Sequence, residues 1–434
     1  MSITNLNHNS RLLFVATYPP QQCGIATFTR DLATAVSGRL GNGQVNIAAV
    51  SETPWAHRYP SEVALTIDRN ERASFRSMAE QINRSDYDAV CVQHEFGIFG
   101  GDEGGHLLDL LHALRKPVVT TLHTVLSEPA GCYHRRLRQV ADASDAVVVL
   151  TPRATHILRE VYGVSPHKVR VIPHGIPDVP FADTEAFKKN FGAEGRMVVM
   201  TFGLIGPSKG IEEMIEAMPA VVERNPQVLY MIVGATHPSI VAREGEWYRR
   251  SLEKKVADLG LQNHVVFHNR YLSDTELREY LCACDIYVTP YPNREQISSG
   301  TLAYATGMGK AVISTPYWYA QDLLADGRGR FVDFRSPSSL SEAINELIEN
   351  DDERNAMRRR AHLHGRRMCW NQVADDYLHL FKRLSRNQDS GVRDVKHYTW
   401  SPSIGNGSKL PAMPAKPYRF GSVTAGYQSL PPNK

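Results

Sequence analysis

Residues 197–218, MVVMTFGLIGPSKGIEEMIEAM, combine an apolar run, a glycine-rich turn and a segment with helical periodicity. The run is apolar on both faces, which is typical of a strand buried inside a parallel sheet. Gly203, Gly206 and Gly210 surround Lys209, so backbone N–H groups, a helix N-terminus and an ammonium group would converge where the strand ends. These groups suit a phosphate, but the spacing is neither Walker nor GxGxxG and excludes a nucleotide-hydrolysing P-loop. A solvated first-turn lysine is the alternative.

The same alternation of apolar runs and helical segments fills the chain on both sides of this stretch. It runs from RLLFVAT at 11–17 to DAVVVLT at 145–151, and it starts again at MVVMTFG and continues to FVDF at 331–334. This pattern predicts an α/β fold whose parallel sheets have helices on both faces. Ten or more strands are too many for one sheet, so we predict two Rossmann-like domains in series, joined by a Pro/Gly hinge at 169–183.

Composition narrows the class of protein without naming a function. Of the 434 residues, 42% are hydrophobic and 22% are charged, which excludes collagen, a coiled coil and wholesale disorder. A net charge of +3, from 49 basic and 46 acidic residues, is too balanced to indicate nucleic acid or an anionic membrane as partner. The cysteines lack zinc spacing, and no signal peptide or long apolar segment is evident, so we expect a cytoplasmic protein without stable membrane insertion.

Polar residues follow several predicted strands of the first half. Gly24 lies in the turn after the first strand, His94 and Glu95 end the third, and His123 ends the fourth. Ligands of parallel α/β sheets bind at the carboxyl ends of strands, so an imidazole and a carboxylate there could bind sugar hydroxyls or move a proton. A structural histidine is the alternative at each place, and no third ligand at suitable spacing indicates a metal.

The second half contains the most informative block, REQISSGTLAYATGMGKAVIST at 294–315. Glu295 follows a strand and a proline-rich turn, and a small-residue sequence then opens a helix. Free N–H groups and a carboxylate would therefore meet a negatively charged or hydroxylated ligand. Glu295 could accept hydrogen bonds from a sugar, or it could only complement the helix dipole. The residues that open the helix are Ser298, Ser299, Gly300 and Thr301.

With these residues in place, the order of elements from about 11 to 384 resembles the retaining glycosyltransferases of family 4, which have the two-domain GT-B fold. FGLIGPSKGIEEMIEAM is similar to the "GRL-three-residues-KG" segment, and VVFHNRYLSDTELREYLCACDIYVTPY to the "V-x-F-x-G" strand and its following helix. REQISSGTLAYATGMGKAVIST resembles the Glu-x7-Glu motif, and VRVIPHGIP the "V-I-P-N-G" hinge. CWNQVADDYLHLFKRL resembles the helix that crosses back to the first domain in this fold.

This resemblance implies a role for each matching position. Lys209 and the amides near Ser298, Ser299 and Gly300 would hold the donor's phosphates, and Glu295 would hold the donor sugar. From the first domain, His123 would face that sugar and Gly24 would lie near the reaction centre. The base would lie near Arg270 and Tyr271. Lys209, His123 and Glu295 are thus the predicted catalytic residues, with Gly203 and Thr301 also on the donor side and His94 and Glu95 as acceptor-side candidates.

Two departures from the family pattern bear on the donor. Leu204 stands where the family usually has an arginine, which removes one of two expected phosphate cations. Ala303 stands where the second Glu of Glu-x7-Glu commonly receives the ribose hydroxyls. Either Arg294 or Arg270 could replace the missing cation, or the donor is not a nucleoside diphosphate sugar.

The domains implied are an acceptor domain at 1–178, a donor-binding domain at 179–370 with the sheets facing an interdomain cleft, a crossing helix at 371–385 and a flexible tail at 386–434. The function implied is metal-independent hexosyl transfer, with retention, from a nucleotide sugar to a hydroxyl of a carbohydrate acceptor. A retaining glycoside phosphorylase that uses sugar 1-phosphate and a non-catalytic sugar-binding protein are the alternatives. No cofactor, metal or nucleic-acid partner is expected, and a homodimer is left open.

Overall fold

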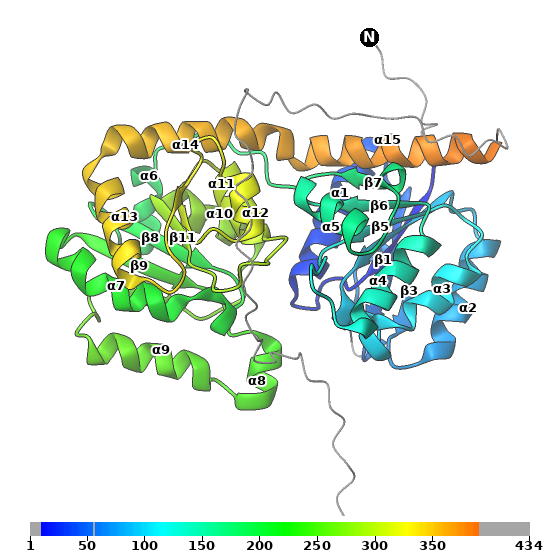
Figure 1. Cartoon of the computed structure of the whole chain (residues 1–434), viewed down its shortest axis with the longest axis horizontal. Coiled ribbons are helices and arrows are strands. Elements are labelled where there is room, and N and C mark those ends of the chain that lie inside the picture. Colours follow the sequence, from blue (N-terminus) through cyan, green and yellow to red (C-terminus); the bar gives the residue numbers. More distant parts are fainter. Residues whose placement is uncertain (1–9, 55–56, 390–434) are drawn as a thin grey trace, which may run out of the picture. The chain divides into compact units, whose positions relative to one another are not determined.

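The computed structural model describes residues 10–54 and 57–389, and Figure 1 shows their arrangement. Almost all of the predicted tail at 386–434 lies outside these residues. Its first residues instead continue the last helix, α15 (Trp370–Asp389), which begins one residue before the predicted 371 and runs past the predicted end at 385.

Strand order confirms two parallel sheets rather than one. The first sheet has seven strands in the order β3-β2-β1-β4-β5-β6-β7, and the second has six in the order β10-β9-β8-β11-β12-β13. In the first sheet the strands are β1 (Leu12–Ala16), β2 (Val45–Ser51), β3 (Val63–Asp68), β4 (Ala89–His94), β5 (Val118–Leu122), β6 (Ala146–Val149) and β7 (Val169–Val171). In the second they are β8 (Met197–Phe202), β9 (Val228–Val233), β10 (Val265–His268), β11 (Ile286–Thr289), β12 (Ala311–Ser314) and β13 (Arg330–Phe331).

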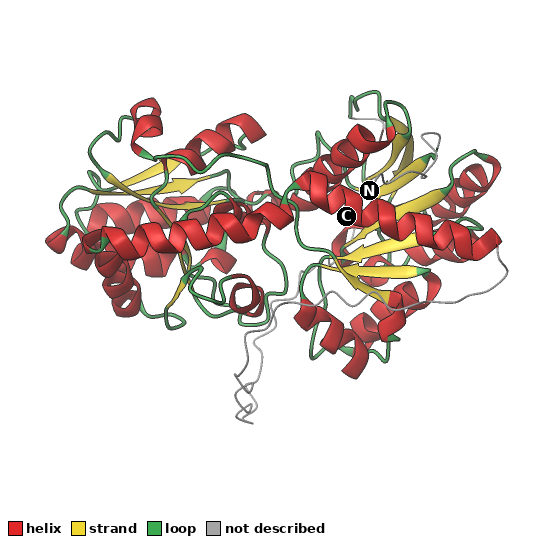
Figure 2. Cartoon of the chain, turned by 90° about the horizontal axis from the view of Figure 1, so that it is seen from above, coloured by secondary structure: helices red, strands yellow, loops and turns green. Residues whose placement is uncertain are grey.

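Helices cover both faces of each sheet, as Figure 2 shows in red around the yellow strands. The helices in the first half of the chain are α1 (Gly24–Leu40), α2 (Arg72–Arg84), α3 (Leu107–Ala113), α4 (Gly131–Ala143) and α5 (Pro152–Glu160). In the second half they are α6 (Glu185–Lys188), α7 (Ile211–Arg224), α8 (Pro238–Glu244), α9 (Trp247–Asp258), α10 (Asp274–Ala283), α11 (Gly300–Gly307), α12 (Trp318–Leu323), α13 (Pro337–Glu349), α14 (Asp351–Gly365) and α15.

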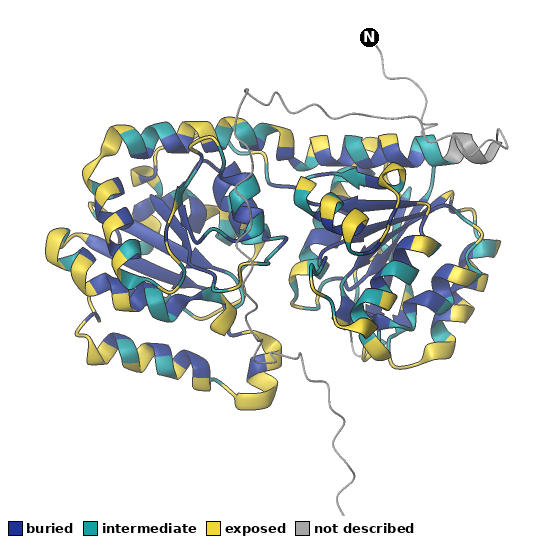
Figure 3. Ribbon diagram, in the orientation of Figure 1, coloured by how far each residue is buried: buried dark blue, intermediate teal, exposed yellow. Residues whose placement is uncertain are grey.

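Strand residues alternate between two hydrophobic clusters because each strand points its side chains to both faces. Leu12 packs in one cluster and its neighbour Leu13 in another, and Met231 and Tyr230 divide in the same way in the second sheet. All four side chains are almost fully buried, and the central strands of both sheets are accordingly dark blue in Figure 3. This two-sided burial explains why the strands read as continuous apolar runs.

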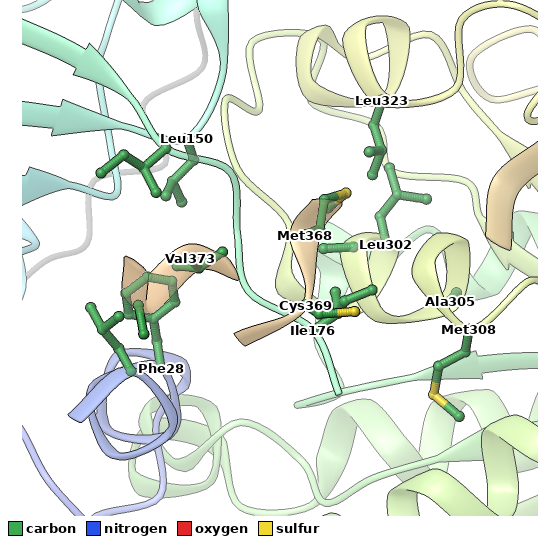
Figure 4. Packing of buried hydrophobic residues seen from close by; sticks show 14 of the residues in the cluster. Phe28, Leu150, Ile176, Leu302, Ala305, Met308, Leu323, Met368, Cys369 and Val373 are labelled. Carbon is green, nitrogen blue, oxygen red and sulfur yellow. The ribbon is translucent and has the colours of Figure 1, made fainter. Parts of the chain in front are cut away.

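The hinge and α15 are joined by direct contacts. The backbone N–H of Ile176 donates to the carbonyl of Met368 at 2.9 Å, and that of Trp370 donates to Ile176 at 3.0 Å. Figure 4 shows Ile176 beside Met368 and Cys369 in the cluster. Farther along α15, the Tyr377 hydroxyl lies 2.7 Å from Thr121 Oγ1 of β5. The last helix therefore reaches the first sheet.

No helix within the described residues is both long enough and apolar enough to cross a membrane.

Candidate functional site

The order of strands reverses at one point in each sheet, between β1 and β4 in the first and between β8 and β11 in the second. In parallel α/β sheets, ligands bind outside the carboxyl ends of strands at such a point, because the neighbouring loops leave in opposite directions. The loops after these four strands carry most of the predicted site residues.

The loop after β8 has the glycine-dependent shape that its sequence predicts. Gly203 has φ 129° and Gly210 has φ 64°, both rare for residues with a side chain. A Cβ on Gly210 would lie only 2.0 Å from the carbonyl oxygen of Pro290. Lys209 is half-buried, and its ammonium donates a hydrogen bond to the Tyr291 hydroxyl at 2.8 Å. The ammonium is therefore held at the edge of the sheet rather than left in open solvent.

The N-terminus of α11 lies next to this lysine. Thr301, in the first turn, has its Oγ1 2.9 Å from the Tyr291 hydroxyl. Ser299 caps the helix by accepting the N–H of Leu302 at 3.3 Å, so the N–H groups of Gly300 and Thr301 have no intrahelical acceptor. The first turn of α11 has no acidic residue, unlike that of α7. The positive end of the α11 dipole is thus not offset by a carboxylate in its own first turn.

Glu295 and Ser298 connect this loop to the first sheet. One oxygen of the Glu295 carboxylate accepts a hydrogen bond from Ser127 Oγ at 2.8 Å. Ser298 Oγ donates to the backbone carbonyl of His123 at 2.9 Å. The predicted donor-side loop and the loop after β5 are therefore in direct contact, which places Glu295 and His123 in the same region.

His123 is 6% exposed and neutral over most of the pH range. Its Nε2 lies 3.0 Å from Gln93 Oε1, an acceptor, so Nε2 carries the proton and Nδ1 is left to accept. The ring packs edge-on against Phe28, with 4.7 Å between centroids. Burial lowers the pKa of His123 to about 3, and His174 and His94 add to this effect. At neutral pH the ring can therefore accept a hydrogen bond but cannot act as an acid.

His94 does not reach a ligand surface in this structure. Its ring is fully buried between Phe96 and Phe99, and neither ring nitrogen has a hydrogen-bond partner in the described part of the chain. Burial lowers the pKa of His94 to about 4, with a further effect of Arg136. The strand-end position suggested an acceptor contact, but the aromatic residues that follow β4 fold over the ring.

The Glu95 carboxylate is also hydrogen-bonded to residues of the first half of the chain. Its carboxylate accepts from the N–H of Phe96 at 2.9 Å and from Thr124 Oγ1 at 2.7 Å. Burial raises the pKa of Glu95, and these two hydrogen bonds oppose that shift. The arrangement braces the loops after β4 and β5, so an acceptor contact would have to displace Thr124 or share the carboxylate.

The remaining predicted residues are more exposed. A Cβ on Gly24 would meet no atom within 4 Å, so the protein itself does not require a glycine there and the space in front of α1 is open. Tyr271, 40% exposed, has its hydroxyl 3.0 Å from Thr27 Oγ1. Arg270 forms an ion pair with Glu276 at 2.6 Å. Its charge is already partnered, which weakens Arg270 as a substitute for a missing phosphate cation.

The two departures from the family pattern differ in their surroundings. Leu204 is half-buried in the turn after β8, whereas Ala303 is fully buried in the hydrophobic core. The neighbouring Tyr304 donates a hydrogen bond to Asp31 of α1 at 2.8 Å. At position 303 the helix therefore contributes core packing and no polar group.

Sequence reasoning missed Tyr291 and Ser127, although both contact predicted residues. Tyr291 ends the VTPY sequence that begins in β11, where an aromatic side chain suggests core packing rather than a hydrogen bond to a lysine. Ser127 lies in the loop after β5, and nothing in the local pattern pairs it with Glu295. Among the described residues, no group of three or more His, Cys, Asp or Glu side chains is arranged to hold a metal ion.

Comparison with protein families gives two matches in tandem. The model described as "Glycosyltransferase Family 4" matches residues 24–178, and the model described as "Glycosyl transferases group 1" matches residues 183–364. Together they cover more than half of the 434 residues. The first match includes His94 and His123, and the second includes Lys209 and Glu295.

Curated relatives are similar over part of their length. D-inositol 3-phosphate glycosyltransferase of Corynebacterium urealyticum is 25% identical over 262 residues, which are 58% of this chain and 60% of that protein. The protein of the same name from Stackebrandtia nassauensis is 26% identical over 62% of this chain and 60% of its own length. Phosphatidyl-myo-inositol mannosyltransferase of Mycolicibacterium smegmatis is 24% identical over 63% and 67%. The chain thus spans less than two thirds of the first two of these relatives.

Solved structures share the fold at low sequence identity. HepE of Anabaena, crystallised with UDP and glucose, has a TM-score of 0.67 at 15% identity and covers 86% of this chain and 100% of its own. Sucrose-phosphate synthase from Thermosynechococcus elongatus has a TM-score of 0.69 at 18% identity, over 86% and 99%. With its two parallel sheets and its tandem family matches, this chain belongs to the glycosyltransferases of group 1 and family 4 and has the GT-B fold.

Proposed function

We propose that this chain transfers a hexosyl unit from a nucleoside diphosphate sugar to a hydroxyl of a carbohydrate acceptor. The observation that carries the proposal is the cluster formed by Lys209, the Gly203 turn and the N-terminus of α11. An ammonium, helix N–H groups and hydroxyls together favour a phosphate-bearing leaving group. The relatives named as glycosyltransferases and the UDP bound to HepE support the same class of donor.

The residues would divide the work between the two halves of the chain. Lys209 and the amides at Ser299, Gly300 and Thr301 would stabilise negative charge that develops on the departing nucleotide, which is where preorganised donors lower a barrier most. Glu295 would accept hydrogen bonds from hydroxyls of the donor sugar. The region 179–370 would then be the donor-binding domain, and the region 1–178 would supply the acceptor side.

Retention of configuration and independence from a metal ion are part of the proposal and come from the family resemblance. Lys209 and the α11 dipole would supply positive charge of the kind that a divalent cation supplies in other phosphate sites. No nucleophile from the enzyme is proposed. The neutral ring of His123 would accept a hydrogen bond from the sugar and leave the charge balance of the site unchanged.

A glycoside phosphorylase is the second candidate, and the burial of Ala303 favours it. A sugar 1-phosphate has no ribose, so it would not need the carboxylate that the family commonly has at this position. Leu204 stands where an arginine is expected, so the site has one phosphate cation fewer. A single phosphate needs fewer cations than a pyrophosphate.

The test offers the full chain each class of donor in parallel. One arm contains UDP-, GDP- or ADP-linked glucose or mannose with acceptors that include inositol 3-phosphate, because two relatives are named for it. The other arm contains glucose or mannose 1-phosphate with the same acceptors, and disaccharides with inorganic phosphate. Product formation and anomeric configuration are followed by NMR. Turnover only in the second arm would identify a phosphorylase, and binding without turnover in either would indicate a sugar-binding protein.

A further inference from the structure

Tyr291 lies in the loop after β11 and packs against residues of the loop after β12. Its side chain is 1% exposed and stacks on Tyr317, with ring centroids 5.2 Å apart and planes 14° from parallel. Its backbone carbonyl accepts a hydrogen bond from Thr315 Oγ1 at 2.6 Å. The ring therefore has little freedom to rotate, and its hydroxyl points to one place.

The hydroxyl of Tyr291 lies within hydrogen-bond distance of Lys209 and Thr301, and it also interacts with Ser299. Lys209 Nζ lies at 2.8 Å and Thr301 Oγ1 at 2.9 Å. An ammonium can only donate, so the phenol oxygen accepts from Lys209. The single phenol proton is then directed to Thr301, whose oxygen accepts it.

The same reasoning directs the proton of Thr301 outward. Its oxygen already accepts from Tyr291, so its own O–H must find another acceptor. Two acceptors within the protein compete for it: Ser299 Oγ, 3.2 Å away and so longer than the 2.7–2.8 Å usual for such a bond, and the Tyr287 hydroxyl, which also interacts with Thr301. A stronger acceptor, such as a phosphate oxygen, would displace these contacts.

Thr301 and Lys209 border the same space. A Cβ built on Gly203 would lie 3.2 Å from the methyl carbon of Thr301 and 3.9 Å from Lys209 Nζ. The absence of a side chain at this glycine keeps that space open beside both groups. Burial alone would raise the pKa of the Tyr291 phenol, but the charge of Lys209 and the hydrogen bonds with Lys209, Thr301 and Ser299 lower it.

We propose that Tyr291 is a positioning residue that connects Lys209 to Thr301 and orients the Thr301 hydroxyl to donate a hydrogen bond to the anion. The relay gives the site a third oriented donor in a chain where Leu204 replaces the expected arginine. The inference rests on the proposed function, because it assumes that an anionic leaving group binds at Lys209.

The experiment measures the affinity of the full chain for UDP, GDP, ADP and inorganic phosphate by titration calorimetry. Tyr291→Phe keeps the stacked ring and removes the hydroxyl, so we expect the affinity for the bound anion to fall about three- to tenfold, the usual effect of one hydrogen bond. Thr301→Val should cause a similar loss, and Thr301→Ser should restore most of it. Because the two residues form one chain, the double variant should lose little more than Tyr291→Phe alone.

Tyr230→Phe is the matched control, since it removes another fully buried tyrosine hydroxyl that bonds to a threonine, Thr201 Oγ1 at 3.0 Å, in the core of the second sheet. It should bind the anion like the wild type, and its melting temperature shows what loss of a buried hydroxyl does to folding alone. Additive losses, failure of Thr301→Ser to restore binding, or unchanged affinity of Tyr291→Phe would each overturn the relay. If Lys209→Ala weakens binding while Tyr291→Phe does not, only the relay fails. If the wild type binds none of the four ligands, the proposed function fails as well.

Discussion

The strand ends of the first sheet carry histidines that burial keeps neutral, whereas the loop after β8 in the second sheet carries an ammonium next to the N-terminus of α11. His94 and His123 have pKa values lowered to about 4 and about 3, so neither is charged at neutral pH. Lys209, in contrast, is half-buried and retains access to a ligand. The same fold element, a loop after a parallel strand, thus carries neutral imidazole rings in one half and an ammonium group in the other.

The physical cause of this difference lies in the residues that come directly after each strand. After β4 come Phe96 and Phe99, which pack on His94 and remove it from water. After β8 comes a turn that contains three glycines, and Lys209 within it is only half-buried. Desolvation disfavours the charged form of an imidazole, which keeps His94 neutral.

Lys209→Ala tests most directly whether the second half of the chain, which contains Lys209, binds a phosphate; we call it the cationic half. We expect the affinity for a nucleoside diphosphate to fall about 100-fold, because a charge-assisted contact to phosphate is lost in a half-buried site. Calorimetry with UDP, GDP and ADP measures the change. Lys254→Ala, which removes an exposed lysine that pairs with Asp258 on α9, is the matched control and should leave affinity unchanged. Equal affinity of the Lys209 variant and the wild type would remove the basis for a cradle in the second half.

The first half, with its neutral histidines, is tested by how the stability of the chain changes at acid pH. His94 has a pKa of about 4 in the folded chain and about 6.5 when unfolded, so its unfolded form binds more protons between these values. The titration of His94 therefore leaves the free energy of unfolding unchanged above pH 6.5. As the pH falls from 6.5 toward 4, it lowers that free energy by up to about 1.4 kcal/mol per pH unit.

His94→Leu removes this titration together with two buried nitrogens that have no partner among the described residues. Urea unfolding at pH 7 and pH 5 should show a smaller loss of unfolding free energy in the variant than in the wild type, by about 1–2 kcal/mol. At pH 7 the variant should be at least as stable. An identical acid response in both proteins would mean that His94 is hydrated or charged in the folded chain.

Glu295→Gln separates the sugar from the phosphate within the cationic half. The amide keeps the shape of the side chain but accepts hydrogen bonds more weakly, so turnover should fall about tenfold, as for loss of one charge-assisted hydrogen bond. Affinity for the free nucleoside diphosphate should not change, since Glu295 is assigned to the sugar. The rate of product formation and calorimetry distinguish the two effects, with Glu216→Gln, an exposed acid paired with Lys255, as control. A loss of nucleotide affinity instead would move Glu295 to the phosphate side.

The contrast between the halves also shows how far local sequence patterns reach. Both sheets could be predicted from apolar runs in the sequence. A strand buried on two faces is a continuous apolar run, without alternating polar residues. The Lys209 turn followed from its glycines, whose positive φ values leave a mark in the sequence. These features are local, so local reasoning reached them.

The features that could not be predicted depend on residues far apart in the chain. The local sequence around His94 is the same whether its ring faces a ligand or lies under Phe99. Its burial depends on how the following loop folds. Tyr291 looked like a core residue, and it is one, but its hydroxyl meets Lys209, 82 positions away. The contact between Ser127 and Glu295 joins loops of different sheets and has no local signal.

That last contact gives the smallest expected effect. Ser127 Oγ occupies one oxygen of the Glu295 carboxylate at 2.8 Å, where a sugar hydroxyl would bind. Ser127→Ala frees this oxygen, so the affinity for a nucleotide sugar should rise about twofold while that for the free nucleoside diphosphate stays the same. Ser127→Thr keeps a hydroxyl and should match the wild type. A weaker affinity for the nucleotide sugar in Ser127→Ala would show the opposite relation: the first half would then hold Glu295 in place for the sugar rather than compete with it.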